Sequence, residues 1–281
     1  SDANIICIKN SVEALQKLTI HHRNKYNIPI IGITGSNGKT IVKEWIYQLL
    51  QKEYKITRSP RSYNSQIGVP FSVWKLDSES QLGVFEAGIS QVGEMEKIAP
   101  VVRPTIGIFT NLGEAHQENF SSLKEKCSEK IKLFKDCPVI LFNKDEKLVD
   151  ICIQQWNSKR EFFTYGRNSQ ADVQIIGEEK QTNQTTIKYL YKGEEYQYTI
   201  PFIHRVSIEN SFPCLALMLH LGYTPKSIEE RMLELEPIAM RMEVKEGENN
   251  CLLINDSYNS DIHSLSIALD FSPPPPTAKN L

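Results

Sequence analysis

The most constraining feature of this sequence is an apolar run that leads through a glycine-rich turn directly into an amphipathic segment. Residues 28–34 are apolar and rich in β-branched side chains, which is typical of a buried parallel strand. Gly35 and Gly38 follow, and residues 41–53 then place apolar side chains on one face at helical spacing. A strand that enters a helix through such a turn predicts an α/β fold with a ligand at the carboxyl end of the strand.

The same alternation of strand-like and helix-like segments continues along the chain. Further buried strands are predicted at 83–87, 105–110 and 139–143, and helices at 11–27, 122–134 and 207–221. This order predicts a doubly wound, mostly parallel sheet. Between residues 161 and 201 the pattern changes to short strands separated by turns, which indicates a small antiparallel sheet appended to the main one.

The C-terminal part combines two more strand-like runs with a helix and a proline tract. The strand-like runs cover residues 241–246 and 251–255, and a helical run follows at 260–271. Pro273–Pro276 are four consecutive prolines, which cannot continue that helix and predict an extended tail.

Composition excludes several classes of partner. A formal net charge of −2 provides no electrostatic basis for binding nucleic acid or a membrane surface. No stretch approaches the roughly 18 consecutive apolar residues of a membrane-spanning helix, and the N-terminus lacks the basic-then-apolar layout of a secretion signal. The six cysteines are scattered, without a C-x-x-C pair or zinc-site spacing. We therefore expect reduced thiols, several of them in the core, in a cytoplasmic protein.

The turn after the first strand has the composition of a phosphate-binding loop. It comprises Gly35, Ser36, Asn37, Gly38, Lys39 and Thr40. Glycines allow backbone N–H groups to point at one phosphate, and the helix N-terminus adds a partial positive charge. Lys39 would neutralise the β- and γ-phosphates of a nucleotide, and the Thr40 hydroxyl would coordinate Mg²⁺. Because Ile33 stands where the general pattern has its first glycine, the alternative is a turn that merely caps a helix, with a solvated Lys39.

The segment Thr34–Thr40 resembles the T-G-x-N-G-K-T/S loop of the Mur ligases and the related folylpolyglutamate synthetases. Further segments resemble motifs of this family in the same order along the chain. They are Phe85–Ser90 with Gly93–Met95, Thr110–His116, Asn143–Asp145 and Asn255–Asn259. The resemblance extends from residue 29 to about residue 270.

The resemblance implies an ATP-dependent, amide-forming ligase of peptidoglycan precursor synthesis. Within the family, the E-x-G-x-S and D-D-x-Y-N patterns point to the branch that adds D-alanyl-D-alanine to UDP-N-acetylmuramoyl-tripeptide. ATP would convert the terminal carboxylate of that peptide to an acyl phosphate, which the amine of the dipeptide would attack.

The resemblance also implies a domain arrangement, because family members have three domains. Residues 1–28 are expected to be a leader helix or linker to a missing substrate domain, 29–240 the central ATP-binding domain, and 241–281 the start of a truncated C-terminal domain. We expect such a fragment to bind nucleotide and to ligate poorly or not at all.

Two metal sites follow from the same resemblance. Thr40 and the phosphates would hold one Mg²⁺, and Glu86 and His116 would hold a second, beside a carbamylated Lys130. Carbamylation requires an uncharged amine, which a desolvated lysine can supply. By itself, however, His116 also fits a polar residue in a surface loop, and Lys130 also fits a solvated, lysine-rich helix face.

The remaining site residues are assigned by resemblance to the nucleotide. Lys39 and Arg241 would stabilise charge on the transferred phosphoryl group, and Asn143 belongs to a nucleotide-side motif. Asn210 would lie near the adenine and Asp256 near the ribose, although Asn210 also fits a polar role at a helix end. The chain departs from the family pattern at Ile203–Arg205, where relatives have G-x-H-N, and at Asn255, where they have an aspartate.

Two other functions share part of this pattern. A folylpolyglutamate synthetase-like ligase has the same loop and the same amide-forming logic, and a nucleotide-binding module could lack ligase chemistry altogether. Keeping Glu86, His116 and Lys130 together favours a ligase, because binding alone needs no second metal site. A GTPase or a kinase is disfavoured, because Asn143–Asp145 lacks the N-K-x-D spacing and no H-R-D loop is present.

Overall fold

A computed structural model describes residues 7–113, 117–155, 160–168, 170–239, 243–246 and 252–255 of the chain. The chain forms two compact units, Ser1–Leu235 and Glu236–Leu281. The helix predicted at 260–271 and the proline tract lie outside the described residues.

The first unit is built on a nine-stranded sheet in the order β2-β3-β1-β4-β5-β6-β7-β8-β9. The strands are β1 (Ile30–Thr34), β2 (Ile56–Arg58), β3 (Leu82–Glu86), β4 (Ile106–Phe109), β5 (Val139–Asn143), β6 (Glu161–Gly166), β7 (Val173–Lys180), β8 (Thr185–Tyr191) and β9 (Glu194–Ile200). All five residues of β1 are buried, as are those of β3, which is the pattern of strands covered on both faces. The predicted doubly wound, mostly parallel sheet is confirmed.

The antiparallel part of the sheet differs from the prediction in one strand. β7 pairs with β8 and β8 with β9 in antiparallel register, which confirms the strand-and-turn pattern after residue 161. β6, however, pairs in parallel with β5 from Glu161 to Tyr165 and with β7 at its end. The strand therefore continues the parallel sheet, and the antiparallel strands extend the same sheet rather than forming a separate one.

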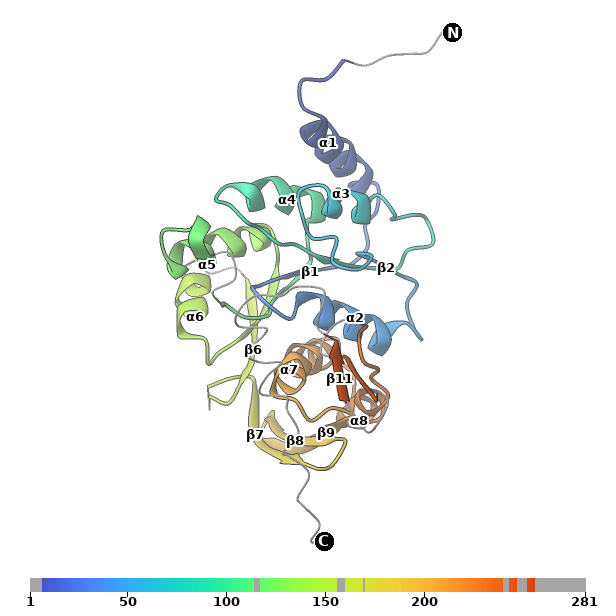
Figure 1. Cartoon of the computed structure of the whole chain (residues 1–281), viewed down its shortest axis with the longest axis vertical. Coiled ribbons are helices and arrows are strands. Elements are labelled where there is room, and N and C mark those ends of the chain that lie inside the picture. Colours follow the sequence, from blue (N-terminus) through green and yellow to red (C-terminus); the bar gives the residue numbers. More distant parts are fainter. Residues whose placement is uncertain are drawn as a thin grey trace. The chain divides into compact units, whose positions relative to one another are not determined.

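Helices cover both faces of this sheet. They are α1 (Ser11–Arg23), α2 (Lys39–Leu50), α3 (Gly68–Val73), α4 (Glu94–Val102), α5 (Leu123–Ile131), α6 (Lys147–Gln154), α7 (Arg205–His220) and α8 (Pro225–Leu233), with 3-10 turns η1 (Gln117–Asn119) and η2 (Lys132–Phe134). Figure 1 shows α3 and α4 on one side of the sheet and α2 and α7 on the other. The sequence pattern did not predict α3, α4, α6 or α8, which have between six and nine residues each and are too short for a clear helical period.

Local sequence explains where several helices begin. The side chain of Asn10 accepts hydrogen bonds from the backbone of Val12 and Glu13 at the start of α1, and Ser122 caps α5 through Glu125. In contrast, α2 begins after Gly38 with no side-chain cap, as do α3, α4, α6 and α7 at their own starts. The uncapped start of α2 is the one that follows the glycine-rich turn.

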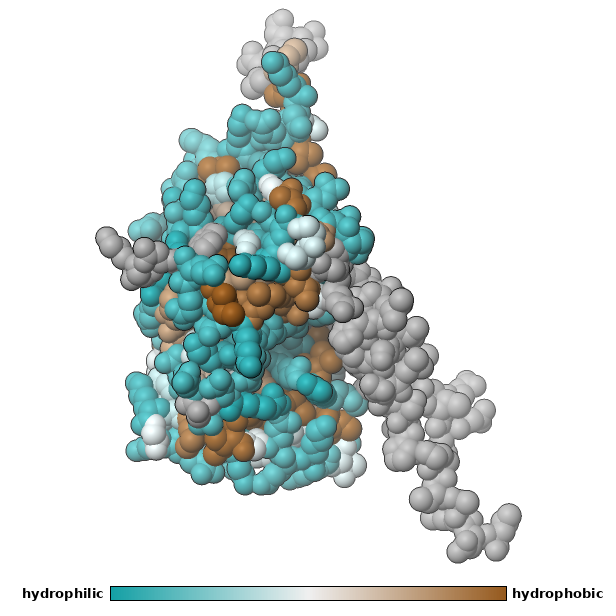
Figure 2. Space-filling view, turned by 90° about the vertical axis from the view of Figure 1, so that its left-hand side faces the viewer, coloured by the Kyte–Doolittle hydropathy of each residue, from teal (hydrophilic) through white to brown (hydrophobic). Residues whose placement is uncertain are grey.

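The second unit contains β10 (Glu243–Glu246) and β11 (Leu252–Asn255), which fall within the two predicted strand-like runs. The two strands pair in antiparallel register. Among the described cysteines, Cys127, Cys137, Cys152 and Cys214 are free and buried and Cys7 is exposed, in agreement with the predicted core thiols. In the described part of the chain, no helix has the length and apolar character needed to cross a membrane. Figure 2 shows a mainly hydrophilic face with smaller apolar patches.

Candidate nucleotide-binding site

The register of three parallel strands brings the predicted site segments to one edge of the sheet. Ile33 of β1 pairs with Glu86 of β3, and Thr34 pairs with Phe109 of β4. The loop after β1 is therefore flanked by the ends of β3 and β4. The strand order reverses at β1, because β3 lies on one side of it and β4 on the other. Ligands of parallel α/β sheets bind at the carboxyl ends of the strands at such a point.

The segment after β4 holds the glycine-rich loop in shape. The backbone N–H of Ser36 donates to the Asn111 carbonyl oxygen at 2.8 Å, and the N–H of Asn37 donates to Asn111 Oδ1 at 2.9 Å. The Thr110 hydroxyl donates to the Asn37 carbonyl oxygen at 2.6 Å. The Thr110–Asn111 pair of the family motif therefore acts as a scaffold for the loop.

The loop presents the start of α2 and a lysine ammonium to the same place. Gly38 has φ +78° and precedes α2, whose first turn carries no side-chain cap. The first N–H groups of a helix lack intrahelical partners and favour an anion. Lys39 Nζ donates to the carbonyl oxygens of Gly35 at 2.9 Å and Ser36 at 2.8 Å, so its charge lies over the loop.

Two oxygen donors suited to Mg²⁺ meet beside the loop. The Thr40 hydroxyl donates to Glu86 Oε2 at 2.9 Å, and the Glu86 side chain is fully buried. Mg²⁺ is commonly held by one or two protein oxygens together with phosphates and water. Among the described residues, no group of three or more His, Cys, Asp or Glu could hold a metal by itself. The Thr40 hydroxyl and the Glu86 carboxylate fit a magnesium ion that is carried with a nucleotide, because both are oxygen donors.

Lys130 lies against the same loop from α5. Its side chain is 3% exposed, and Nζ donates to the Gly35 carbonyl oxygen at 3.1 Å. Burial, followed by the positive charges of Lys39 and Lys126, holds the pKa of the Lys130 amine well below its ordinary value. The solvated helix face that its lysine-rich surroundings also suggested is therefore wrong for this residue.

Asn210 packs against the glycine that precedes α2. A Cβ atom added to Gly38 would lie 2.2 Å from Asn210 Oδ1. Asn210 is 6% exposed, and its Nδ2 has no hydrogen-bond partner within the described residues. A buried amide donor that lacks a partner is costly, so a ligand that accepts from it would stabilise the site. This orphaned donor next to the loop is a second observation that fits a bound nucleotide.

The contacts of Asn143 do not include the loop, and three other predicted site residues cannot be placed relative to it. Asn143 Oδ1 accepts the N–H of Asp145 at 2.9 Å and lies close to Gly166, so its contacts are local to the end of β5. His116, Arg241 and Asp256 lie outside the described residues. Their assigned roles stay predictions.

Lys43 and the segment 59–62 also reach the site, although the sequence patterns did not predict them. Ser62 Oγ lies 2.9 Å from the Thr40 hydroxyl, and Lys43 contacts Glu86 at 3.3 Å. A signal was present for Lys43, because it occupies the apolar face of α2 with Val42 and Ile46. Segment 59–62 has no pattern that would have identified it.

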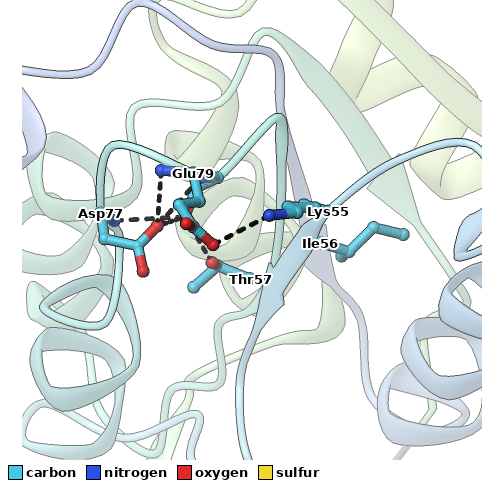
Figure 3. Close-up of a pocket in the computed structure, with 6 residues that line it drawn as sticks. Lys55, Ile56, Thr57, Asp77 and Glu79 are labelled. Carbon is cyan, nitrogen blue, oxygen red and sulfur yellow. Dashed lines mark hydrogen bonds and ion pairs between the residues drawn. The ribbon is translucent and has the colours of Figure 1, made fainter.

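A shallow recess elsewhere on the sheet is separate from this site. It is lined by Lys55, Ile56, Thr57, Asp77, Glu79 and Ser80, and Figure 3 shows their side chains. These residues lie at the amino ends of β2 and β3, whereas the glycine-rich loop follows the carboxyl end of β1. Lys55 and Glu79 pair at 2.9 Å, and Asp77 Oδ1 accepts from the backbone N–H groups of Glu79 and Ser80.

The fold and the loop define an α/β domain in which an uncapped helix follows a glycine-rich turn at the switch point of a parallel sheet. Comparison with known families matches residues 33–218, more than half of the chain, to the Mur ligase middle domain. The chain therefore belongs to this family.

Individual relatives agree with that assignment. The chain is 32% identical over 264 residues to the UDP-N-acetylmuramoyl-tripeptide–D-alanyl-D-alanine ligase of Borreliella burgdorferi, a match that covers 91% of this chain and 54% of the relative. It is 24% identical to the ligase of the same name from Bacillus subtilis, over 95% of this chain and 58% of the relative. Among solved structures, MurF from Acinetobacter baumannii superposes with a TM-score of 0.86 at 21% identity, over 96% of this chain and 60% of that one, and this likeness shows the shared fold. The chain thus spans little more than half the length of the curated relatives it matches.

Proposed function

We propose that this chain is the ATP-binding core of an ATP-dependent peptide ligase that joins D-alanyl-D-alanine to UDP-N-acetylmuramoyl-tripeptide in the cytoplasm. The observation that carries the proposal is the convergence of Lys39, Lys130 and the Thr40–Glu86 pair on one uncapped helix start. The names of the matched relatives favour this branch over the folate ligases. Ligase chemistry, rather than nucleotide binding alone, is favoured because a buried carboxylate and a buried amine lie beside the phosphate position.

In this mechanism the chain's own groups bind and orient the triphosphate. The first turn of α2 receives the β-phosphate, and Lys39 shifts from the carbonyl oxygens of Gly35 and Ser36 to the phosphate oxygens. Charge that develops on the transferred phosphoryl group is thereby balanced before the substrate carboxylate attacks the γ-phosphorus. The carboxylate oxygen forms the new bond to phosphorus, and ADP leaves.

One Mg²⁺ would be held by the Thr40 hydroxyl and the phosphates, and a second by Glu86 and His116; Glu86 Oε2 also reaches the first position, because it accepts from the Thr40 hydroxyl. These ions would neutralise charge and polarise the γ-phosphate. Glu86 suits this role because its carboxylate is already desolvated and oriented toward Thr40. His116 and Arg241 are proposed to complete the second metal site and the phosphoryl contacts, and Asp256 the ribose contact. Asn143 and Asn210 are proposed to contact the nucleoside side.

Carbamylation of Lys130 is part of the same proposal. A neutral amine attacks the carbon of CO₂ and loses a proton, which leaves a negatively charged carbamate. The lowered pKa of Lys130 favours the neutral amine, since burial disfavours its ammonium form. The carbamate would then balance the charges of Lys39 and of a nearby metal ion.

Titration calorimetry with AMP-PNP, a non-hydrolysable ATP analogue, tests the nucleotide site. We expect magnesium-dependent binding that is stronger than binding of GTP. Lys39→Ala should weaken AMP-PNP binding by about 10- to 100-fold, because it removes a charge-assisted contact worth about 1.5–3 kcal/mol.

Lys52→Ala, just past the end of the same helix, is the matched control. Its side chain is 64% exposed and pairs with Glu234, so its loss should leave nucleotide affinity unchanged. Equal affinities for the Lys39 variant and the unmodified chain would refute the assignment of the loop.

A further inference from the structure

Lys43 is a charged residue buried in the apolar face of α2. Its side chain is 0% exposed, and the neighbouring Val42 and Ile46 of that helix are equally buried. Burying an ammonium is costly unless it is paired and hydrogen-bonded. The burial of Lys43 therefore indicates that its ammonium group makes specific contacts with buried acceptors.

The contacts of Lys43 account for its whole hydrogen-bonding capacity. Nζ donates to the Ser59 carbonyl oxygen at 2.7 Å and to the Arg61 carbonyl oxygen, and it contacts Glu86 Oε1 at 3.3 Å and Glu44 Oε1 at 3.0 Å. An ammonium has three donors. Lys43 thus has no donor left for a phosphate, unlike Lys39 at the mouth of the loop.

These contacts divide the two oxygens of Glu86 between two partners. Oε1 faces Lys43, while Oε2 accepts the hydroxyl of Thr40. The backbone N–H of Glu86 also donates to the Ser59 hydroxyl at 3.3 Å. Lys43 therefore joins three segments: the helix that follows the loop, the end of β3 and the segment at 59–61.

We propose that Lys43 is a positioning residue that holds the Glu86 carboxylate with one oxygen turned toward Thr40, so that the magnesium position is assembled before nucleotide and metal arrive. This inference rests on the proposed function, because it concerns the metal that accompanies ATP. Lys43 acts through Glu86 and through the carbonyl oxygens of Ser59 and Arg61, and it touches no substrate.

If Lys43 acted only through its charge, its removal would change the Mg²⁺ affinity in the opposite direction to that expected for a positioning residue. Removing a positive charge next to a metal site would strengthen Mg²⁺ binding if charge alone mattered. Removing a group that orients a metal-ligand carboxylate weakens metal binding, typically by about 10- to 100-fold. The direction of the change in magnesium dependence therefore separates the two roles.

The test compares four forms of the chain: unmodified, Lys43→Met, Glu86→Gln and the double variant. Calorimetry measures the affinity for AMP-PNP in EDTA and in saturating MgCl₂, and the ratio of the two is the magnesium enhancement. We expect Lys43→Met to lower this enhancement by about 10- to 100-fold, Glu86→Gln to lower it similarly, and the double variant to fall no further. Affinity in EDTA is measured for each form, so that the ratio removes any change in metal-free nucleotide binding from the comparison.

Lys132→Met is the matched control, because Lys132 also pairs with two glutamates, Glu96 and Glu129, but away from the loop. It should leave the magnesium enhancement unchanged. If Lys43→Met does not fold by circular dichroism, Glu86→Gln is compared with the double variant, in which neither member of the buried pair is charged. Equal enhancement in those two forms supports the positioning role.

Several results would overturn the inference. An unchanged or increased magnesium enhancement in folded Lys43→Met would show that Lys43 does not orient the metal ligand. A double variant weaker than Glu86→Gln would show that Lys43 acts independently of Glu86. Absence of AMP-PNP binding by the unmodified chain would refute the proposed function and the inference with it, and it is recognised before any variant is measured.

Discussion

Substituting Gly38 by alanine separates the two reasons for a glycine at the start of α2. At φ +78° an alanine is strained by about 1–2 kcal/mol. Its Cβ would also lie 2.2 Å from Asn210 Oδ1, and accommodating such a contact in a packed site costs about 1–3 kcal/mol more. We therefore expect Gly38→Ala to destabilise the chain by about 2–5 kcal/mol.

Gly93 provides a control with the same backbone conformation and no contact. It has φ +84°, precedes α4 without a side-chain cap, and a Cβ there would meet nothing within 4 Å. Gly93→Ala should therefore cost only the strain of about 1–2 kcal/mol. The difference between the two variants isolates the contact with Asn210.

Urea denaturation followed by circular dichroism measures these differences, and calorimetry with AMP-PNP measures the effect on the site. Gly38→Ala should weaken nucleotide binding because the loop or Asn210 must move, whereas Gly93→Ala should not. Adding Asn210→Ala to Gly38→Ala should remove the contact part of the cost and leave the strain. If Gly38→Ala and Gly93→Ala were equally stable and bound AMP-PNP equally well, the packing of Asn210 on the loop would be refuted.

Two further predictions concern buried charges outside the loop. Burial raises the pKa of Glu146 to about 7, although the hydrogen bond from the Leu112 N–H acts to lower it. The pKa of this carboxyl group is about 4.5 in the unfolded chain, so the folded chain binds the proton more tightly. The stability due to this group is present below about pH 4.5 and is lost as the pH rises through about 7. Glu146→Gln should accordingly flatten the decline in melting temperature over that range, and an unchanged pH profile would count against the shift. Arg23 is 2% exposed and donates to the carbonyl oxygens of Val102, Tyr26 and Arg103. Arg23→Met should therefore lower the free energy of unfolding, measured by urea denaturation, by about 3 kcal/mol. The control Arg205→Met, at a side chain that is 84% exposed, should change it by no more than about 0.5 kcal/mol.

The position of the site was predictable because its determinants are local. Local patterns identify the strand at 28–34, the glycines at 35 and 38 and the helix that follows. The carboxyl ends of parallel strands then meet at one edge of the sheet, where a ligand is expected. In the structure, Glu86 contacts Thr40 and Lys130 contacts Gly35, so both side chains lie against the loop. The helices α3, α4 and α6 could not be predicted from the sequence, because their apolar faces are too short to show a helical period and become evident only from the residues that they contact.

Sequence by itself determined the alternating α/β order, the glycine-rich loop and the family to which the chain belongs, since each depends on residues that lie close together along the chain. Tertiary structure decided that β6 continues the parallel sheet, that Lys130 is buried against Gly35, and that Asn210 lies on Gly38. It also decided that Lys43 joins Glu86 to the segment 59–61. These contacts link residues from 16 to 172 positions apart in the chain, and only packing of the folded layers brings such residues into contact.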